Sequence, residues 1–395
     1  PMEVLSLKTA LWLYLFLFLA FFDLHAQYPI LTPFAISLGA GPAFIGWMMG
    51  MYSLTHLPGN LLAGVLVDRN GSRRYIVFAL TAAGAILLMQ AHTQLPWHLL
   101  LLRAASGFAL AFLSPACMAL LASPPSHPAP PATYMSGHGI LHTLPSVVPP
   151  AAAAFIVAKA GYSGTFTTLG WLLILTGVMA LFSVPKQVQS MSAAKPALPL
   201  HSPAQAADRQ NPRVSRRYYL LPFFVSCSQG VLFFELPLSQ GSEGMISTGI
   251  LLSLLSLGAL VTLSLLFLNR FAPGIRIAAA LLAMALCFFT LAAFRHIPAG
   301  VVLFLLGSAK GVLFPAMASL FISLGGPGRM GRTFSLQSIA MSLGAFAGPV
   351  AAGQLRDFVS PYFIAFVLLM TAILLLPPRG SGKPAYHPEW NSPAA

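Results

Sequence analysis

The chain has 395 residues, of which 57% are hydrophobic and only 7% are charged, and its mean hydropathy is +0.80. Soluble domains carry roughly 25% charged residues, so this composition excludes a water-soluble fold and favours a lipid bilayer as the solvent. The net charge of +13 would suggest nucleic acid in a soluble protein, but here the basic residues are spread over loops. We therefore expect no nucleic-acid partner.

Twelve apolar stretches follow one another along the chain, and a span needs ~20 such residues. They lie at about 9–31, 42–67, 74–92, 97–122, 133–158, 165–184, 218–238, 246–268, 276–295, 299–322, 333–355 and 360–377. The segment 185–217 is rich in proline and basic residues, which is typical of a solvated linker. We expect an all-α polytopic membrane protein in four parts, namely an N-terminal six-helix bundle (1–184), a cytoplasmic linker (185–217), a C-terminal six-helix bundle (218–378) and a cytoplasmic tail (379–395).

The basic residues also predict the orientation. With the N-terminus inside, 16 of the 21 Lys and Arg residues fall on the inner side, and only Lys159, Arg295 and Arg356 fall outside. Inner loops of membrane proteins carry such an excess. We expect both termini to be cytoplasmic, in a bacterial cytoplasmic (inner) membrane.

The two halves of the chain repeat each other. Asp68-Arg69 corresponds to Asn269-Arg270, Gly107 and Pro115 correspond to Gly307 and Pro315, and Pro149-Pro150 corresponds to Gly348-Pro349. The offsets are all close to 200 residues. Nearly equal offsets along the chain indicate duplication of a six-helix unit.

A charged run between the second and third spans is the most distinctive motif. It contains Gly64, Asp68, Arg69, Gly71, Arg73 and Arg74. With this run, the chain resembles the major facilitator superfamily over nearly its whole length, closest to the twelve-helix drug/proton antiporter branch, although Ser72 stands where that family has a basic residue. The resemblance implies a conformational latch on the inner side.

The residue types in this run fit such a latch. Gly64 would let two helices approach closely. Asp68 would face the positive N-terminal end of a helix from the other half. The arginines would pair with Asp68 or with anionic lipid. The alternative is a plain positive-inside loop.

Two further motifs bear on transport. Arg103-Ala104-Ala105-Ser106-Gly107 in the fourth span resembles the family's motif associated with proton movement. The family's glycine–proline cluster in the fifth span is replaced by Pro145, Pro149 and Pro150. An intact version lies in the eleventh span, where it predicts close packing and a helix bend, at Gly344, Gly348 and Pro349. Because of this departure, the motif of the fifth span does not itself indicate antiport.

Charged and polar side chains within the spans are functional candidates by default. Asp23 follows Phe21-Phe22 in the first span, and Glu235 follows Phe233-Phe234 in the seventh, so the two acids could face one cavity. We expect Asp23, Arg103 and Glu235 to couple protons, with a structural Asp23–Arg103 pair as the alternative for Asp23. Candidate residues of a substrate cavity are His25, Gln27, His142, Gln229 and Lys310.

For two of these candidates the sequence leaves an alternative open. Lys310 could instead form an ion pair with Asp23 or Glu235. His138 and His142 lie four residues apart and share a helix face, but no carboxylate cluster lies nearby in the sequence. We expect no metal site.

The resemblance implies a secondary transporter that works by alternating access. In the favoured interpretation, protonation of Asp23 is coupled to export of a small organic or amphipathic solute. One alternative is a proton-coupled or facilitative importer of a nutrient, metallophore or lipid-like solute, and another is a non-transporting membrane receptor or scaffold. The sequence has no phosphate loop and no nucleophile–base set, so we expect neither an enzyme nor a cofactor. The expected partners are a small-molecule substrate, protons and membrane lipid, and we expect a monomer.

Overall fold

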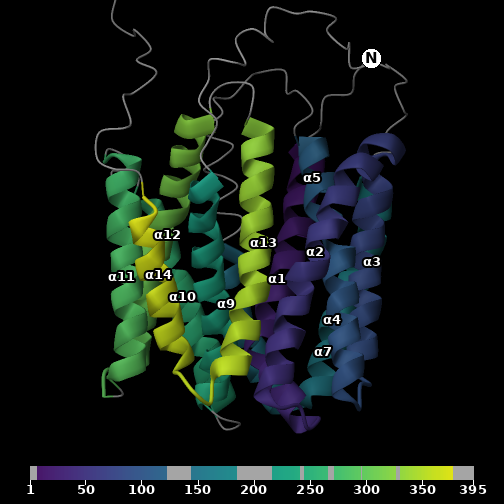
Figure 1. Ribbon diagram of the computed structural model, residues 1–395. Coiled ribbons are helices and arrows are strands. Elements are labelled where there is room, and N and C mark those ends of the chain that lie inside the picture. The colour runs from purple at the N-terminus through teal and green to yellow at the C-terminus, as the bar shows by residue number, and fades with distance from the viewer. Residues whose placement is uncertain are drawn as a thin grey trace, which may run out of the picture.

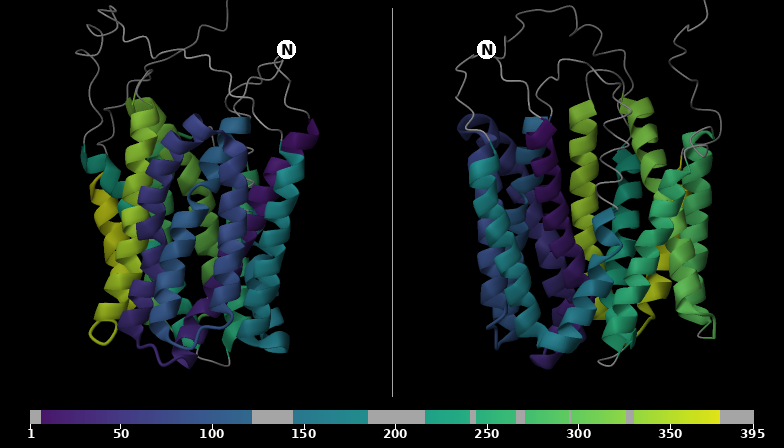
Figure 2. Two further views of the ribbon diagram at one scale, coloured as in Figure 1. Left: turned by 90° about the vertical axis from the view of Figure 1, so that its right-hand side faces the viewer. Right: turned by 180° about the vertical axis from the view of Figure 1, so that it is seen from behind.

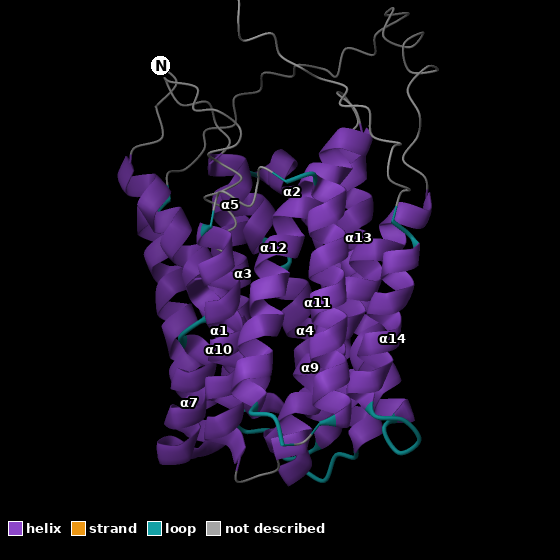
Figure 3. Cartoon of the chain, turned by 90° about the vertical axis from the view of Figure 1, so that its left-hand side faces the viewer, coloured by secondary structure: helices purple, strands orange, loops and turns teal. Residues whose placement is uncertain are grey.

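The computed structural model describes residues 7–121, 144–184, 216–240, 244–265, 271–294, 296–325 and 330–376. In these ranges the regular structure is helical throughout, and no strand is assigned (Figure 3). The expected all-α membrane fold is therefore confirmed. Most of the expected linker and all of the expected tail lie outside the described residues.

The N-terminal half supplies the first six spans. Its helices are α1 (Leu7–Ser37), α2 (Pro42–Asn70), α3 (Ser72–Gln90), α4 (Pro96–Leu110), α5 (Leu113–Leu121) and, after the short helix η1 (Leu144–Ser146), α7 (Pro149–Ser183). The fourth span is α4 continued by α5. Within α7 the backbone φ at Gly161 is 71°, a left-handed value that suits glycine, so two spans meet there.

The C-terminal half supplies the other six spans. After η2 (Arg216–Tyr219) come α9 (Leu220–Gln240), α10 (Met245–Ser264), α11 (Pro273–Ala293), α12 (Ala299–Gly325), α13 (Met330–Leu355) and α14 (Pro361–Leu374). Nine described stretches are long and apolar enough to cross a membrane; α2 is more polar, and α14 has only 14 residues. With Leu144–Ser183 divided at Gly161, each of the twelve expected spans has its helix.

Alternate helices run in opposite directions, so the bundle has two ends (Figures 1 and 2). The end at which α1 begins and α14 finishes is called the terminal end here, and the end at which α1 finishes and α14 begins is the opposite end. Several helices begin with proline at a first position, as at Pro42, Pro96 and Pro361. Proline is favoured there because its missing N–H would have no helical partner.

The two halves repeat the same helix packing. A Cβ at Gly107 of α4 would collide with the backbone oxygen of Tyr52 in α2, and one at Gly307 of α12 would collide with that of Leu255 in α10. Threonine hydroxyls fasten both contacts, since Thr55 donates to the Ala104 carbonyl (2.7 Å) and Thr262 donates to that of Ser308 (2.9 Å). The two glycines are 200 residues apart, so the repeat in the sequence is matched by a repeat in helix packing.

The halves meet along two seams, where α2 packs against α13 and α7 against α10. Figure 1 shows α13 at the centre of the bundle, where it packs against α2 and α9. A Cβ at Gly46 of α2 would strike Pro349 of α13, and a Cβ at Gly249 of α10 would come within 2.6 Å of the Pro150 carbonyl. Both contacts lie toward the opposite end.

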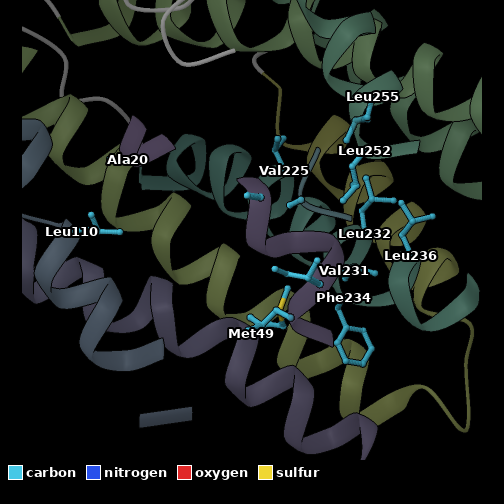
Figure 4. Close-up of a cluster of buried hydrophobic side chains, with 14 of the residues drawn as sticks. Ala20, Met49, Leu110, Val225, Val231, Leu232, Phe234, Leu236, Leu252 and Leu255 are labelled. Atoms are coloured by element: carbon cyan, nitrogen blue, oxygen red, sulfur yellow. The ribbon is translucent and has the colours of Figure 1, made fainter. Parts of the chain in front are cut away.

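Aromatic side chains also connect the two halves toward the opposite end. The rings of Tyr28 in α1 and Phe233 in α9 stack with centroids 4.1 Å apart, and Trp47 of α2 meets Phe346 of α13 edge-on. In the described part of the chain, the close glycine and aromatic contacts between the halves all lie toward the opposite end. Buried apolar side chains of both halves, such as Met49 and Phe234, belong to one cluster (Figure 4).

The glycine–proline cluster of α13 packs closely, as expected. A Cβ at Gly344 would collide with the Phe223 carbonyl of α9, and one at Gly348 with the Cys227 carbonyl. Pro349 lies within α13 and packs against Gly230. The glycines therefore hold α13 directly against α9, while a bend at Pro349 stays a prediction.

Candidate functional site

A buried polar network connects the first and fourth spans. Gln27 lies one helical turn after Asp23 in α1, and its amide Nε2 donates a hydrogen bond to Asp23 Oδ2 over 2.9 Å. From α4, Arg103 Nη1 donates to Gln27 Oε1 over 2.8 Å. All three side chains are at most 2% exposed. Gln27 thus bridges an acid and a base that are not in direct ion-pair contact.

The network keeps unused hydrogen-bonding capacity. Asp23 Oδ1 and Arg103 Nε have no hydrogen-bond partner among the described residues. Buried polar atoms are nearly always paired, and unpaired ones call for an explanation. A carboxylate oxygen without a partner can accept a proton. Asp23 can therefore be either ionised or neutral within the same network.

A tyrosine ring lies against the guanidinium of Arg103. The Cζ atom of Arg103 lies 4.8 Å from the ring centroid of Tyr52, within the range of a cation–π interaction. The Tyr52 ring in turn stacks on His56, with centroids 5.7 Å apart. Sequence reasoning missed Tyr52; its signal was the spacing Tyr52-x-x-x-His56, which places two polar rings on one face of the second span.

The structure places Arg103 in the interior and not at the membrane surface. Arg103 lies only seven residues after the start of α4 at Pro96. From this position its side chain could also extend to the membrane–water interface. Its head group instead turns inward onto Gln27 and Tyr52. The energetic cost of placing a cation at this depth is therefore met by a network of partners.

Glu235 lies in a different environment from Asp23. It accepts hydrogen bonds from Arg356 Nε (2.9 Å) and Nη2 (3.3 Å), which tie α9 to the end of α13. Glu235 is five residues from the end of α9 at Gln240, whereas Asp23 is 14 residues from the end of α1 at Ser37. The Phe-Phe-acid repeat therefore does not place the two acids at equivalent depths, and the structure brings Glu235 to Arg356 rather than to Arg103.

Comparison with known proteins decides the family. A model of the Major Facilitator Superfamily matches residues 13–349. The chain belongs to the Major Facilitator Superfamily. It is accordingly an integral, multi-pass membrane transporter of small molecules and not an enzyme.

Relatives within the superfamily are distant in sequence. Multidrug resistance protein MdtG of Escherichia fergusonii is 24% identical over 380 residues, covering 92% of this chain and 90% of the relative. MdtG of Escherichia coli is 23% identical over 379 residues, with the same coverage. Identity at this level leaves the cargo open.

Solved facilitator structures share the fold. A bacterial homologue of the human lysosomal transporter Spinster, in an inward-facing and unoccupied conformation, gives a TM-score of 0.68 at 16% identity, covering 93% of this chain and 94% of that one. The nucleoside transporter NupG gives 0.68 at 15% identity, with 93% and 97% covered. The human organic anion transporter MFSD10 (TETRAN) gives 0.64 at 18%, with 94% and 99% covered.

The expected latch of this facilitator is only partly described. Gly71, with a φ of 83°, forms the turn between α2 and α3 and donates its N–H to the Val67 carbonyl. Arg73 donates to the Leu181 carbonyl at the end of α7, while Arg69 and Arg74 are exposed. The position of the Asp68 side chain lies outside the described residues. The latch therefore stays a prediction.

The close helix approach expected at Gly64 does not occur in this conformation. A Cβ there would meet nothing within 4 Å. The close approaches on α2 lie at Gly46, Gly50 and Gly59, and a Cβ at Gly59 would come within 2.7 Å of the Ala111 Cβ. The glycine of a loop motif need not mark the closest contact, because the neighbouring turns of the helix decide which face packs.

The remaining described cavity candidates of the facilitator come from three different helices, α1, α9 and α12. His25 Nδ1 lies 2.8 Å from the Phe21 carbonyl, and Gln229 Nε2 has no hydrogen-bond partner among the described residues. Lys310 is partly accessible, with Nζ 5.8 Å from the Phe314 ring centroid. His138 and His142 lie outside the described residues. Within the part that is described, no group of three metal-ligating side chains occurs.

Proposed function

We propose that this transporter exports a small organic or amphipathic solute in exchange for protons, and that Asp23 carries the proton. The observation that supports this most is the buried Asp23–Gln27–Arg103 network, in which one Asp23 carboxylate oxygen has no hydrogen-bond partner among the described residues. Ionisable side chains inside a membrane protein usually mark a proton or ion pathway. The cargo and the proton would then bind in the same interior region of the bundle.

The network suggests how protonation is coupled to cargo. With Asp23 ionised, its carboxylate accepts from Gln27 and offsets the positive charge of Arg103 through the bridging amide. A proton on Asp23 removes that negative charge and leaves Arg103 unbalanced in a medium of low polarity, where charges interact strongly. The two protonation states therefore favour different arrangements of α1 and α4, and this difference is what can drive a conformational change.

The conformation supports access from the terminal end. The halves touch through Gly46, Gly249 and the Tyr28–Phe233 stack, all toward the opposite end. With the basic residues cytoplasmic, as expected, the terminal end faces the cytoplasm and the cargo enters from there. We assign residues 1–184 and 218–378 as the two rocking bundles.

The run Gly64–Arg74 then serves as the latch that closes the terminal end in the alternate state. Its partner would be a helix N-terminus of the other half, which attracts the Asp68 carboxylate. Asp68→Ala would release the latch, and labelling of a cysteine introduced at the terminal end would rise. Unchanged labelling would count against the latch.

The proposed direction of transport is based on the relatives. The MdtG proteins, which are multidrug resistance proteins, support export. The displaced glycine–proline cluster of the fifth span and the fold similarity to a nucleoside transporter keep a proton-coupled importer as the second candidate. A bacterial inner-membrane location also fits these relatives.

Everted membrane vesicles with an acidified lumen test the direction. An exporter that exchanges protons should accumulate dye in the lumen, and the probes are the xanthene dyes 5-carboxyfluorescein and rhodamine 6G. Collapse of the pH gradient should abolish the accumulation. Accumulation only when the lumen is made alkaline would favour the importer, and no protein-dependent flux of any cargo that binds would favour a receptor.

A further inference from the structure

Lys310 occupies the middle of α12, on the face turned away from lipid. It is nine residues from Val301, and nine steps of 100° place the two side chains on opposite sides of the helix. Val301 is 57% exposed, and Leu305 on the same side is 53% exposed. Close packing of Gly307 and Gly311 against α10 fixes this rotation of α12. Lys310 therefore points into the interior of the bundle.

Side chains on the interior face of α12 differ in their accessibility along the helix. Leu303, Met317 and Phe321 lie on the same helix face and are fully buried. Lys310 and Phe314, between them along the helix, are partly accessible. Lys310 and Phe314 are therefore partly accessible side chains on an interior face, near the middle of the helix.

No acid within the described parts of the spans is left to pair with Lys310. The sequence has only eight acidic residues, and just two of them, Asp23 and Glu235, lie well inside the spans. Asp23 accepts from Gln27, and Glu235 accepts from Arg356. The contact described for the ammonium group is the Phe314 ring, at 5.8 Å. The two ion pairs that the sequence left open for Lys310 are thus not formed.

We infer that Lys310 binds an anionic group of the cargo, and that the cargo is an organic anion with an apolar or aromatic body. An ammonium group inside a membrane protein is costly without a compensating charge. A carboxylate, sulfonate or phosphate of a bound solute supplies that charge, and the Phe314 ring supplies a surface for the apolar body. The inference rests on the proposed function in one respect, namely that the cargo binds in the interior of the bundle.

The matched control for this site is Lys159. Its ammonium group also lies over a phenylalanine ring, at 4.6 Å from the Phe155 centroid, but on an exposed surface at the opposite end. Lys159→Met therefore removes the same charge and the same type of aromatic contact without touching the interior. Lys310→Arg keeps the charge, and Lys310→Met removes it with little change in volume.

Equilibrium binding to the purified, full-length protein in detergent is the test. The wild type should bind 5-carboxyfluorescein and 8-anilinonaphthalene-1-sulfonate in a salt-sensitive manner. Lys310→Met should weaken both at least tenfold, whereas Lys310→Arg and Lys159→Met should stay within threefold of the wild type. Binding of the cationic dye rhodamine 6G should be unchanged or tighter in Lys310→Met.

A thermal-unfolding measurement without dye distinguishes a binding role from a structural one. If the charge serves the cargo, Lys310→Met should unfold at the same or a higher temperature than the wild type, because an uncompensated interior charge has been removed. A lowered unfolding temperature together with unchanged anion affinity would overturn the inference. So would a wild type that shows no salt-sensitive binding of either anion.

These outcomes are separable from those of the proposed function, since binding in detergent needs no proton gradient. Anion binding that depends on Lys310 without gradient-driven flux would overturn proton-coupled export alone. Gradient-driven flux of rhodamine 6G without anion binding would overturn the anion site alone.

Discussion

At the scale of single residues, the bridging glutamine is the least replaceable part of the network. Gln27 uses its amide N–H for Asp23 and its amide oxygen for Arg103, so one side chain satisfies two buried charged groups. The corresponding first helix of the other half carries Gln229, whose Nε2 has no hydrogen-bond partner among the described residues. Gln27 and Gln229 can therefore be compared for their effect on stability.

Gln27→Leu should therefore destabilise the protein by about 1–3 kcal/mol, because it leaves two buried charged groups without their shared partner. Gln229→Leu should change the stability by less than ~1 kcal/mol, since an apolar side chain replaces an amide whose Nε2 has no hydrogen-bond partner among the described residues. Thermal unfolding of both variants in the same detergent measures the difference. Equal unfolding temperatures would show that the bridge contributes nothing.

The sequence identified Asp23 and Arg103 as candidates because charge is rare inside spans, a signal that needs no structure. It could not show that Gln27 joins them, since contacts between α1 and α4 depend on helix rotation. For the same reason, the sequence could not show that Glu235 lies at a different depth from Asp23. Its local match to Asp23 was a short pattern in a phenylalanine-rich chain, and only the helix ends revealed the difference in depth.

At the scale of elements, small residues set the distances between helices. Without a hydrophobic driving force between helices in lipid, close backbone approach through glycine becomes important. The contacts of α2 with α4 and of α10 with α12 both use it. The repeat offset of 200 residues predicted this equivalence, and the spans were predicted closely because hydropathy follows bilayer thickness directly. The contact expected at Gly64 is absent in this conformation, because the position of a motif does not specify which face of the helix packs.

Gly307→Ala should cost about 1–3 kcal/mol of stability, because the added methyl group would collide with the Leu255 backbone and force α12 away from α10. Gly64→Ala is the control, since a methyl group there meets nothing within 4 Å and alanine is the better helix former by up to ~1 kcal/mol. Unfolding temperatures in detergent should fall for Gly307→Ala and hold or rise for Gly64→Ala. The reverse order would contradict the packing described here.

At the scale of the whole molecule, the structure is one state of a transporter that must have at least two. The halves are joined toward the opposite end by Gly46, Gly249 and the Tyr28–Phe233 stack. Sequence alone could not predict which state is adopted, because one chain specifies both and their free energies differ by only a few kcal/mol. Proton binding at Asp23 is the proposed source of the bias between them.

Asp23→Asn tests that central claim most directly. The purified variant and the wild type are placed in proteoliposomes, and accumulation of 5-carboxyfluorescein under a pH gradient is compared with its exchange at equal pH on both sides. Asparagine keeps an oxygen that can accept from Gln27 but cannot gain or lose a proton. The account predicts that gradient-driven accumulation falls to background while exchange is retained. Full gradient-driven accumulation by Asp23→Asn would contradict it.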